Sequence, residues 1–421
     1  MREDTIGRKK ASHLFQQLRG RGWLLERMGE VISEGKRGLD GLALELGRMV
    51  AEAVMYLERE EVAGPDYRPH SREVRKWASQ RGSVFIGDRK VKVDHPRLRG
   101  PAGEMRLRSY EKLRDSGGFS EELLGKVLRG LSQRRYSQTL VETGKAFGVS
   151  AGSISRHVVK ASARRLKEFR ERSLKGFEPF AIFLDTIHRG GEAFLVGLGI
   201  DVEGKKRVLG FWQGASENSE ICQALLSELD SRGLVLSKNI VFVTDGGKGI
   251  IKALKERIGS GLIHQRCTIH KDRNIQRHLA KRWRKEAHRR FRAALEQNSY
   301  TDAKKMLKDF EQWLRQLNES AADSLGEALE EILTVHRLKV PALLRKTLHS
   351  TNPIESMFAT VRECEGHIKR YRGSAMSQRW LGTVLSHVEQ GFRTIKGYKE
   401  IAAVIATIEA EQAQTRKTKA A

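Results

Sequence analysis

The sequence predicts an α/β fold: a mixed five-stranded sheet with helices on its faces, interrupted by an all-helical insertion and preceded by a mainly helical region. Three apolar, β-rich runs separated by short turns begin at residue 179, and two more strand-like runs alternate with helical patterns up to residue 267. After residue 270 no strand pattern remains. Hairpin strands followed by alternating helices and strands are typical of a mixed sheet covered by helices.

The N-terminal part of the chain is expected to be mainly helical. Between residues 12 and 60, apolar residues recur at helical spacing, which predicts two or three amphipathic helices. Residues 83–100 instead alternate apolar and polar side chains around a Gly87-Asp88 turn, which predicts a β-hairpin. The pattern does not indicate which sheet this hairpin joins.

Residues 138–166 resemble a helix-turn-helix. Ala146 and Val149 would pack between its two helices, and Gly148 would form the turn. Ser150 would then cap a recognition helix that carries Ser153, Ser155, Arg156 and His157. An ordinary helical hairpin stays open as the alternative, because helix-turn-helix patterns recur by chance.

The core elements follow one another in a recognisable order. Strands are expected at residues 179–187, 192–201, 205–214, 239–247 and 261–267, and helices at 219–233 and 248–258. Three strands, a helix, a strand, a helix and a strand form the order of the ribonuclease-H-like fold. Residues 271–345 are predicted to be helical, and a further helix begins after Ser350.

The charge of the chain predicts a polyanionic partner. Lys and Arg outnumber Asp and Glu by 78 to 52, which gives a formal net charge of +26. This excess disfavours a small-metabolite protein and favours nucleic acid as the partner. Charge alone leaves general RNA association open, so motifs must decide between the two.

Cysteine usage and hydropathy predict a soluble protein of the cytoplasm. The three cysteines are odd in number and far apart, so a disulfide framework is not expected and a reducing compartment is. No apolar run approaches the roughly 20 residues that cross a bilayer, and the first residues lack the apolar stretch of a signal peptide.

Two aspartates occupy positions that favour metal chemistry. Asp185 lies near the end of the first predicted core strand, and Asp245 ends the fourth. Carboxylates on one edge of a sheet can share Mg²⁺ ions, which prefer oxygen ligands, and two such ions support phosphoryl transfer. Gly246 and Gly247 would leave room for a phosphate to approach. Taken singly, each aspartate is also a common turn or cap residue.

A third carboxylate is expected from Glu355. Asn352 is a good N-cap and Pro353 suits the first helical position, so Glu355 falls in the first turn of a helix. Asn352 and Glu355 also have capping-box spacing, so a purely structural role stays open at this point. Other acids follow this motif, namely Glu363, Glu365 and Glu389.

Five segments of the chain resemble, in family order, the successive motifs of the Mutator-type transposases of bacterial insertion sequences: FLDTI, VEGKKRVLGFWQGASENSE, FVTDGGKGI, QRCTIHKDRN and STNPIES. The resemblance runs from about residue 179 to 395. It implies a DDE catalytic triad of Asp185, Asp245 and Glu355 on a ribonuclease-H-like domain, with an all-helical insertion before the glutamate. These three acids would be both the catalytic residues and the ligands of two Mg²⁺ ions, with Mn²⁺ as a substitute.

The family's Cys-x2-His motif falls on Cys267 and His270. As a zinc site it is poor, because two ligands are too few and His264 adds only a third. Cys267 is expected to be a buried residue at a strand end. His270 would orient an active-site carboxylate or contact the scissile phosphate, or else satisfy a local backbone group. Thr186 departs from the family pattern, in which Gly often follows the first Asp.

The resemblance and the charge together predict which residues contact DNA and where the regions of the chain begin and end. Phosphate contacts are expected from Arg134, Arg135, Arg164, Arg165, Arg273 and Asn274, and base contacts from Arg156. A solvated helix face is the alternative for the arginine pairs. The expected regions are helices at 1–80, a hairpin and helix-turn-helix at 81–175, the core at 176–272, the insertion at 273–345, final core helices at 346–395 and a C-terminal helix with a basic tail at 396–421.

The function implied is that of an insertion-sequence transposase, which cleaves DNA at terminal inverted repeats and transfers the ends to target DNA. It would act as a homodimer or higher oligomer on DNA, associated with the bacterial nucleoid. Two alternatives remain at this point: an inactive DNA-binding protein derived from a transposase, and a structure-specific nuclease of the same fold.

Overall fold

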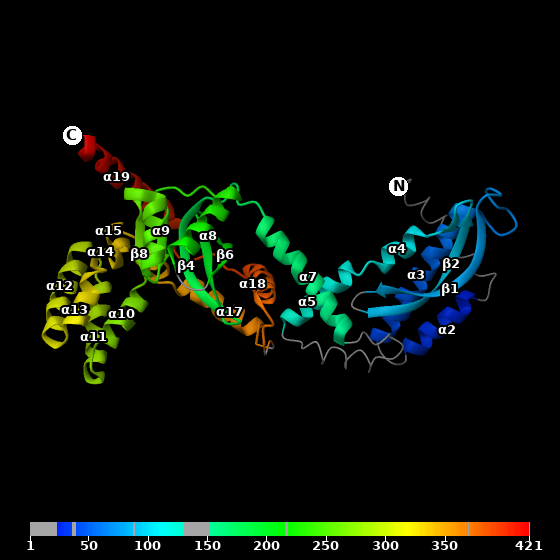
Figure 1. The fold of residues 1–421 in the computed structure, drawn as a ribbon, viewed down its shortest axis with the longest axis horizontal. Coiled ribbons are helices and arrows are strands. Elements are labelled where there is room, and N and C mark those ends of the chain that lie inside the picture. The colour runs from blue at the N-terminus through cyan, green and yellow to red at the C-terminus, as the bar shows by residue number, and fades with distance from the viewer. Residues whose placement is uncertain are drawn as a thin grey trace. The chain divides into compact units, whose positions relative to one another are not determined.

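The computed structural model describes residues 23–35, 39–86, 89–129, 151–214, 218–366, 368 and 370–420. The chain divides into two compact units, Met1–Ser162 and Ala163–Ala421, and the division falls inside one long helix. Figure 1 shows the helices and strands of both units.

The first unit combines helices with a small antiparallel sheet. Its elements are α2 (Trp23–Gly35), α3 (Leu39–Ala63), β1 (Arg75–Ile86), β2 (Arg89–Gly100), β3 (Gly103–Met105), α4 (Arg108–Arg114), α5 (Gly117–Leu128) and the first part of α7 (Ala151–Glu171). Val84 and Val93 of the sheet pack on Met55 of α3. The predicted hairpin is therefore confirmed, and it belongs to a three-stranded sheet with the order β1-β2-β3.

Helix α7 contains the second half of the predicted helix-turn-helix. Ile154 is buried on its inner face, and Arg156 is exposed. His157 faces inward as well: its Nδ1 lies 3.0 Å from the Ser120 hydroxyl, and its ring contacts Phe85 edge-on. Of the expected recognition-helix side chains, His157 is thus part of the packing of the unit. Arg134, Arg135 and the predicted turn lie outside the described residues.

The second unit is built on a five-stranded mixed sheet. Its strands are β4 (Pro179–Arg189), β5 (Glu192–Asp201), β6 (Lys206–Gly214), β7 (Val241–Thr244) and β8 (Ile263–Arg266). They lie in the order β6-β5-β4-β7-β8. Strands β4, β5 and β6 pair antiparallel, whereas β7 pairs parallel with β4 and with β8. The predicted mixed α/β sheet is confirmed, and its strands lie where the apolar runs predict them.

Helices pack on both faces of this sheet. Helices α8 (Ser219–Ser231) and α9 (Lys248–Ile258) bury a leucine-rich core with Leu184 and Phe242 on one face. On the other face, Phe211 contacts Phe169 of α7 and lies close to Gly382 of α18 (Ser374–Glu389). A sheet that is buried on both sides explains why the strands are nearly continuous apolar runs.

Every described element between β8 and α17 (Asn352–Cys364) is helical. These helices are α10 (Thr268–Arg277), α11 (Lys281–Leu295), α12 (Tyr300–Leu317), α13 (Glu319–Gly326), α14 (Leu329–Ile332), α15 (Thr334–Arg337) and α16 (Ala342–Leu348), drawn from green to orange in Figure 1. They bury a hydrophobic core of their own around Phe291, Leu307 and Phe310. The chain ends in α19 (Ile401–Ala420). Across the described ranges, no helix is both long and apolar enough to span a bilayer.

Candidate active site

Asp185 and Asp245 lie side by side at one edge of the parallel part of the sheet. Leu184 of β4 pairs with Thr244 of β7, and each aspartate is the next residue of its strand segment. Strand β4 itself continues to Arg189 against β5, so Asp185 lies four residues before the end of the strand, not at the end. The pairing between β4 and β7 ends just before the two aspartates. Their carboxylates therefore lie at the edge of the sheet where these two strands separate.

Backbone groups hold both carboxylates. The Thr186 N–H donates a hydrogen bond of 2.8 Å to Asp185 Oδ1, and the Gly247 N–H donates one of 2.9 Å to Asp245 Oδ1. Gly246 has a φ of 98°, and the Arg266 side chain lies against its Cα, where a Cβ would stand. The space expected for a phosphate at Gly246 is therefore filled by Arg266.

The environment of Asp185 resists a negative charge. Burial, helped by the nearby carboxylates of Asp245 and Glu355, raises the pKa of its carboxyl group to about 7 against the opposite effects of the Thr186 N–H and His270. Electrostatic coupling of this kind requires the charged groups to be close neighbours. The three acids that the sequence selects are separated by up to 170 residues in the chain, yet Asp245 and Glu355 are near enough to Asp185 to act on its charge.

Glu355 lies in the first turn of α17, but the cap differs from the expected one. Thr351 is the N-cap residue, and the helix begins at Asn352. The Thr351 hydroxyl donates a hydrogen bond of 2.7 Å to Glu355 Oε1, whereas the Asn352 N–H points to the Ser350 hydroxyl at 3.5 Å. The capping box between Asn352 and Glu355 is therefore not formed. The Glu355 carboxylate is instead held toward the site.

The other acids of this region have separate partners. Glu365 is buried and forms an ion pair with Arg189, and Glu389 binds Arg172 through two hydrogen bonds of 2.7 and 2.8 Å. Glu363 is exposed on the surface of α17. Glu355 is thus the acid of this segment that is coupled to Asp185.

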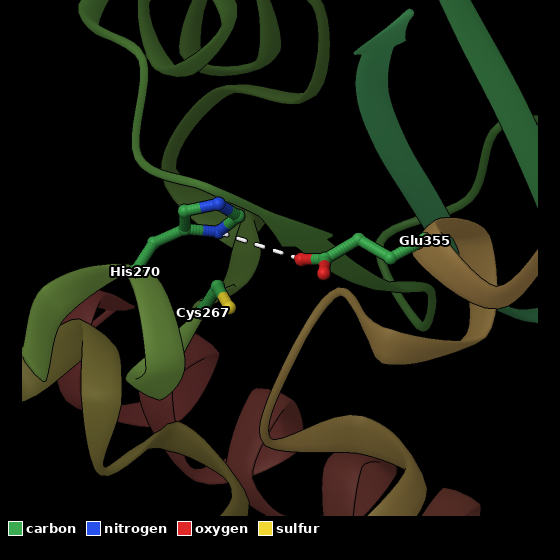
Figure 2. A group of neighbouring side chains, drawn as sticks. All are labelled: Cys267, His270 and Glu355. Atoms are coloured by element: carbon green, nitrogen blue, oxygen red, sulfur yellow. Dashed lines mark ion pairs between the residues drawn. The ribbon is translucent and has the colours of Figure 1, made fainter. Parts of the chain in front are cut away.

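Cys267 and His270 lie beside Glu355 (Figure 2). Cys267 is fully buried just after β8, and its N–H donates to the Thr244 carbonyl at 2.8 Å. Its sulfur accepts a hydrogen bond of 3.3 Å from the Thr351 N–H, and the Thr351 hydroxyl, which donates its proton to Glu355, also lies 3.3 Å from the sulfur. Burial opposes ionisation of the thiol, but the hydrogen bonds from His270 and Thr351 outweigh it and lower the Cys267 pKa.

The surroundings of His270 favour its protonated form. The hydrogen bond and the charge of Cys267, with smaller effects of Glu355 and Asp185, raise the His270 pKa to about 9 against burial. Its Nδ1 lies 3.8 Å from Glu355 Oε1 and 3.4 Å from the Thr351 hydroxyl. The side chain therefore faces the carboxylates rather than a local backbone group.

One set of ligand atoms within 4.8 Å of one another belongs to Cys267, His270 and Glu355, which is not the triad expected from the sequence. This set is a poor metal centre. The Cys267 sulfur already accepts a hydrogen bond from the Thr351 N–H, and three ligands do not close a tetrahedral site. The three acids, with oxygen donors and mutual repulsion, suit a hard divalent cation better.

The candidate DNA contacts have different surroundings. Arg273 is exposed and Asn274 half-buried, one helical turn after His270 on α10. Arg164 is exposed on α7 and lies 3.2 Å from Glu168, an i,i+4 pair, while Arg165 is partly buried on the same helix. The pair with Glu168 matches the solvated-face alternative for Arg164.

Sequence reasoning missed the role of Thr351. This residue is fully buried and contacts Cys267, His270 and Glu355. It stands within the STNPIES motif, four residues before Glu355, which is one helical turn. The four-residue spacing could have indicated that Thr351 contacts Glu355. Asn352 is also a good cap residue, however, and the sequence does not decide between the two.

The site thus consists of two aspartates at the edge of a mixed sheet and a glutamate on a later helix. The chain belongs to the Mutator family of transposases, whose family model matches residues 25–394. It is 28% identical to the transposase for insertion sequence element ISRM5 of Rhizobium meliloti, over 77% of this chain and 81% of that protein. It is 28% identical to the transposase for IS6120 of Mycolicibacterium smegmatis, over 58% and 76%. It is also 25% identical to the transposase for IS406 of Burkholderia multivorans, over 86% and 94%.

Proposed function

We propose that this chain cleaves DNA strands at the terminal inverted repeats of an insertion sequence and joins the freed 3′ ends to target DNA. The observation that carries the proposal is the placement of Asp185 and Asp245 side by side after the paired residues Leu184 and Thr244, with Glu355 near enough to act on the charge of Asp185. The names of the relatives, all insertion-sequence transposases, support it. We also infer that the sheet and its helices form a ribonuclease-H-like domain, with residues 273–345 as an insertion.

The three acids fit divalent cations. They offer carboxylate oxygens, and their repulsion, which disfavours ionised Asp185, is relieved by a positive ion. Two Mg²⁺ ions, when bound, activate the attacking oxygen and stabilise the leaving oxygen of an in-line displacement. Backbone N–H groups of Thr186 and Gly247 fix one oxygen of each aspartate and leave the other oxygen for the ion.

The neighbouring side chains have complementary tasks in this proposal. Thr351 holds one oxygen of Glu355 through its hydroxyl. His270, cationic and half-buried, places a positive charge and an N–H beside the carboxylates, where a phosphate oxygen of the strand would lie. Arg273 and Asn274 on the next turn of α10 extend this surface along the DNA backbone.

DNA is the proposed partner, in two forms: the ends of the element and the target. Residues up to about 175, including Arg156 on α7, would recognise the ends. We propose a homodimer or a higher oligomer on DNA, since an element has two ends that must be processed together, and a place in the bacterial cytoplasm at the nucleoid. An inactive DNA-binding protein would bind without cleavage, and a structure-specific nuclease would cleave without joining.

The test combines a gel-shift with a strand-transfer assay in Mg²⁺, using the element ends and a target plasmid. Asp185→Asn, Asp245→Asn and Glu355→Gln should each abolish cleavage and joining while end binding stays close to wild type, because each change removes a metal ligand and leaves the basic surface intact. Glu363→Gln, on the exposed side of the same helix, is the matched control. Joining at the wild-type rate by a triad variant would remove that residue from the site.

A further inference from the structure

The side of α10 that carries His270 continues away from the candidate active site as a row of cations. His270, Arg273 and Arg277 follow one another at intervals of three and four residues and therefore lie on one side of this helix. Both arginines are exposed, and the buried residues of α10 lie on its other side. Because His270 faces Glu355, the two arginines lie on the part of the helix that leads out of the site.

Helix α11 adds further cations close to Arg277. Lys281 begins α11 four residues after Arg277, so the two Cα atoms are at most about 15 Å apart. Lys285 follows one turn later, and both lysines are exposed and form no ion pair with an acid in the described part of the chain. The one acidic residue of α11, Glu286, is instead bound by two arginines of the next turn. We call four residues the α10–α11 basic surface: Arg273, Arg277, Lys281 and Lys285.

The start of α11 is an unfavourable place for cations. The N-terminus of a helix carries partial positive charge, which favours acidic side chains there. The first turn of α11 instead contains Lys281, Arg282 and Arg284 and no acidic residue, and the N-cap residue, Ala280, makes no side-chain hydrogen bond to the helix. A bound anion lowers this electrostatic cost.

The composition of these helices fits a phosphate backbone better than a protein partner. Interfaces between proteins bury aromatic and other large apolar side chains at their centre. Both α10 and α11 are described in full, and neither exposes a large apolar side chain; the guanidinium group of Arg282 lies 5.5 Å over the half-buried ring of Trp283. Lysines one turn apart are separated by about 6 Å along the helix axis, close to the roughly 6.8 Å between every second phosphate of one DNA strand.

We propose that the α10–α11 basic surface binds the phosphate backbone of duplex DNA beside the point of cleavage. The inference rests on the proposed function and deepens it, because it assigns a part of the DNA-binding surface to the helices that follow β8. Contacts of this kind supply affinity without sequence preference. Two duplexes offer the same chemistry, the end of the element and the target DNA, and the experiment distinguishes them.

The test measures binding of duplex DNA to the full chain in EDTA, so that no cleavage interferes. The double variant Lys281→Ala, Lys285→Ala removes two charges from the α10–α11 basic surface. The matched control is Lys305→Ala, Lys308→Ala, which removes the same charge from α12. All four lysines are exposed, so neither pair of substitutions removes a buried group. Filter binding of a scrambled duplex over a series of salt concentrations gives the affinity and its salt slope.

The Lys281→Ala, Lys285→Ala variant should bind the duplex at least tenfold more weakly than the wild type at about 0.1 M salt. The magnitude of its slope should fall by about 2, since each phosphate contact contributes about 0.9. The Lys305→Ala, Lys308→Ala variant should stay within twofold of the wild type, with an unchanged slope. An equal loss in both variants, which would show that net charge alone sets the affinity, overturns the proposal, and so does a wild-type slope in the Lys281→Ala, Lys285→Ala variant.

A second arm in Mg²⁺ identifies the duplex. Slower cleavage of the element ends by the Lys281→Ala, Lys285→Ala variant, with normal joining of pre-cleaved ends, assigns the surface to the element end. Normal cleavage with slower joining assigns it to the target DNA. The binding result is separable from the proposed function, because it requires neither metal nor the triad. A chain that shows the difference in binding and never cleaves DNA would refute the cleavage chemistry alone.

Discussion

The hydroxyl of Thr351 donates a 2.7 Å hydrogen bond to the carboxylate of Glu355, one turn further along the same helix. The same hydroxyl lies 3.3 Å from the Cys267 sulfur. Thr351 is fully buried, and its hydrogen bond holds one oxygen of the Glu355 carboxylate in place. A metal ligand that is held in this way does not have to be ordered when the ion binds.

Thr351→Val should therefore lower strand cleavage by about 10- to 100-fold, the usual cost of losing a group that orients a metal ligand. The Mg²⁺ concentration for half-maximal activity should rise, which a purely structural role would not cause. DNA binding should be unchanged. Thr351→Ser keeps the hydroxyl and should recover most of the activity; equal activities of the Val and Ser variants would show that the hydroxyl is not what matters.

Neutralising Asp185 should stabilise the metal-free protein at high pH. The folded pKa of about 7 lies above the ordinary value of 3.8, so the stability that the protonated group contributes is fully present below pH 3.8 and is lost as the pH rises through 7. At about 1.4 kcal/mol per pKa unit, ionised Asp185 lowers the free energy of unfolding by at most about 4 kcal/mol. Partial exposure of the carboxyl group makes the actual cost smaller.

Thermal unfolding in EDTA measures this effect. Asp185→Asn should melt above the wild type at pH 8, and the difference should shrink as the pH falls toward 5. Mg²⁺ should raise the melting temperature of the wild type and have little effect on the variant. Glu363→Gln, an exposed neutralisation, is the control. A difference that does not change with pH would contradict the electrostatic explanation.

Binding to duplex DNA should weaken steeply with salt, because each phosphate contact contributes a slope of about −0.9 in a double-logarithmic plot. Arg273→Ala should reduce the magnitude of this slope by about 1. Arg315→Ala serves as the control, since Arg315 lies within 3.3 Å of Glu311 and 3.1 Å of Asp323 and its charge is already compensated. Equal slopes for wild type and Arg273→Ala would place the phosphate contacts elsewhere.

Arg156 should contribute to the recognition of the element ends. It is exposed on α7, while its neighbours Ile154 and His157 face the interior of the first unit. Arg156→Ala should reduce discrimination between end and scrambled duplexes by about 1–3 kcal/mol in competition binding at fixed salt. Arg164→Ala is the control and should leave this discrimination unchanged, because Arg164 is already paired with Glu168 on the same helix. An unchanged specificity ratio for Arg156→Ala would favour the simple helical hairpin.

Strands β4, β5 and β6 were predictable because each contains a long apolar run that is buried in the sheet, and such a run leaves few alternatives. The N-cap of α17 could not be predicted from the sequence. Thr351 and Asn352 are both good cap residues, and only the backbone angles decide between them. The contact between Cys267 and Thr351 joins residues 84 positions apart, and no local spacing encodes it. The inward orientation of the His157 side chain is likewise not encoded locally, because it depends on contacts with Phe85 and Ser120.

The run of helices from α10 to α16 begins and ends at neighbouring points. Hydrogen bonds join Thr268 to His349 and Cys267 to Thr351 there. A segment whose ends are fastened together can lengthen or shorten at small cost, since the entropy of closing a loop grows only slowly with its length. Glu355 would keep its position if this helical segment became longer or shorter. Relatives of this chain are therefore free to diverge in that segment, and its outer helices are natural points for inserting a fluorescent label or a second domain.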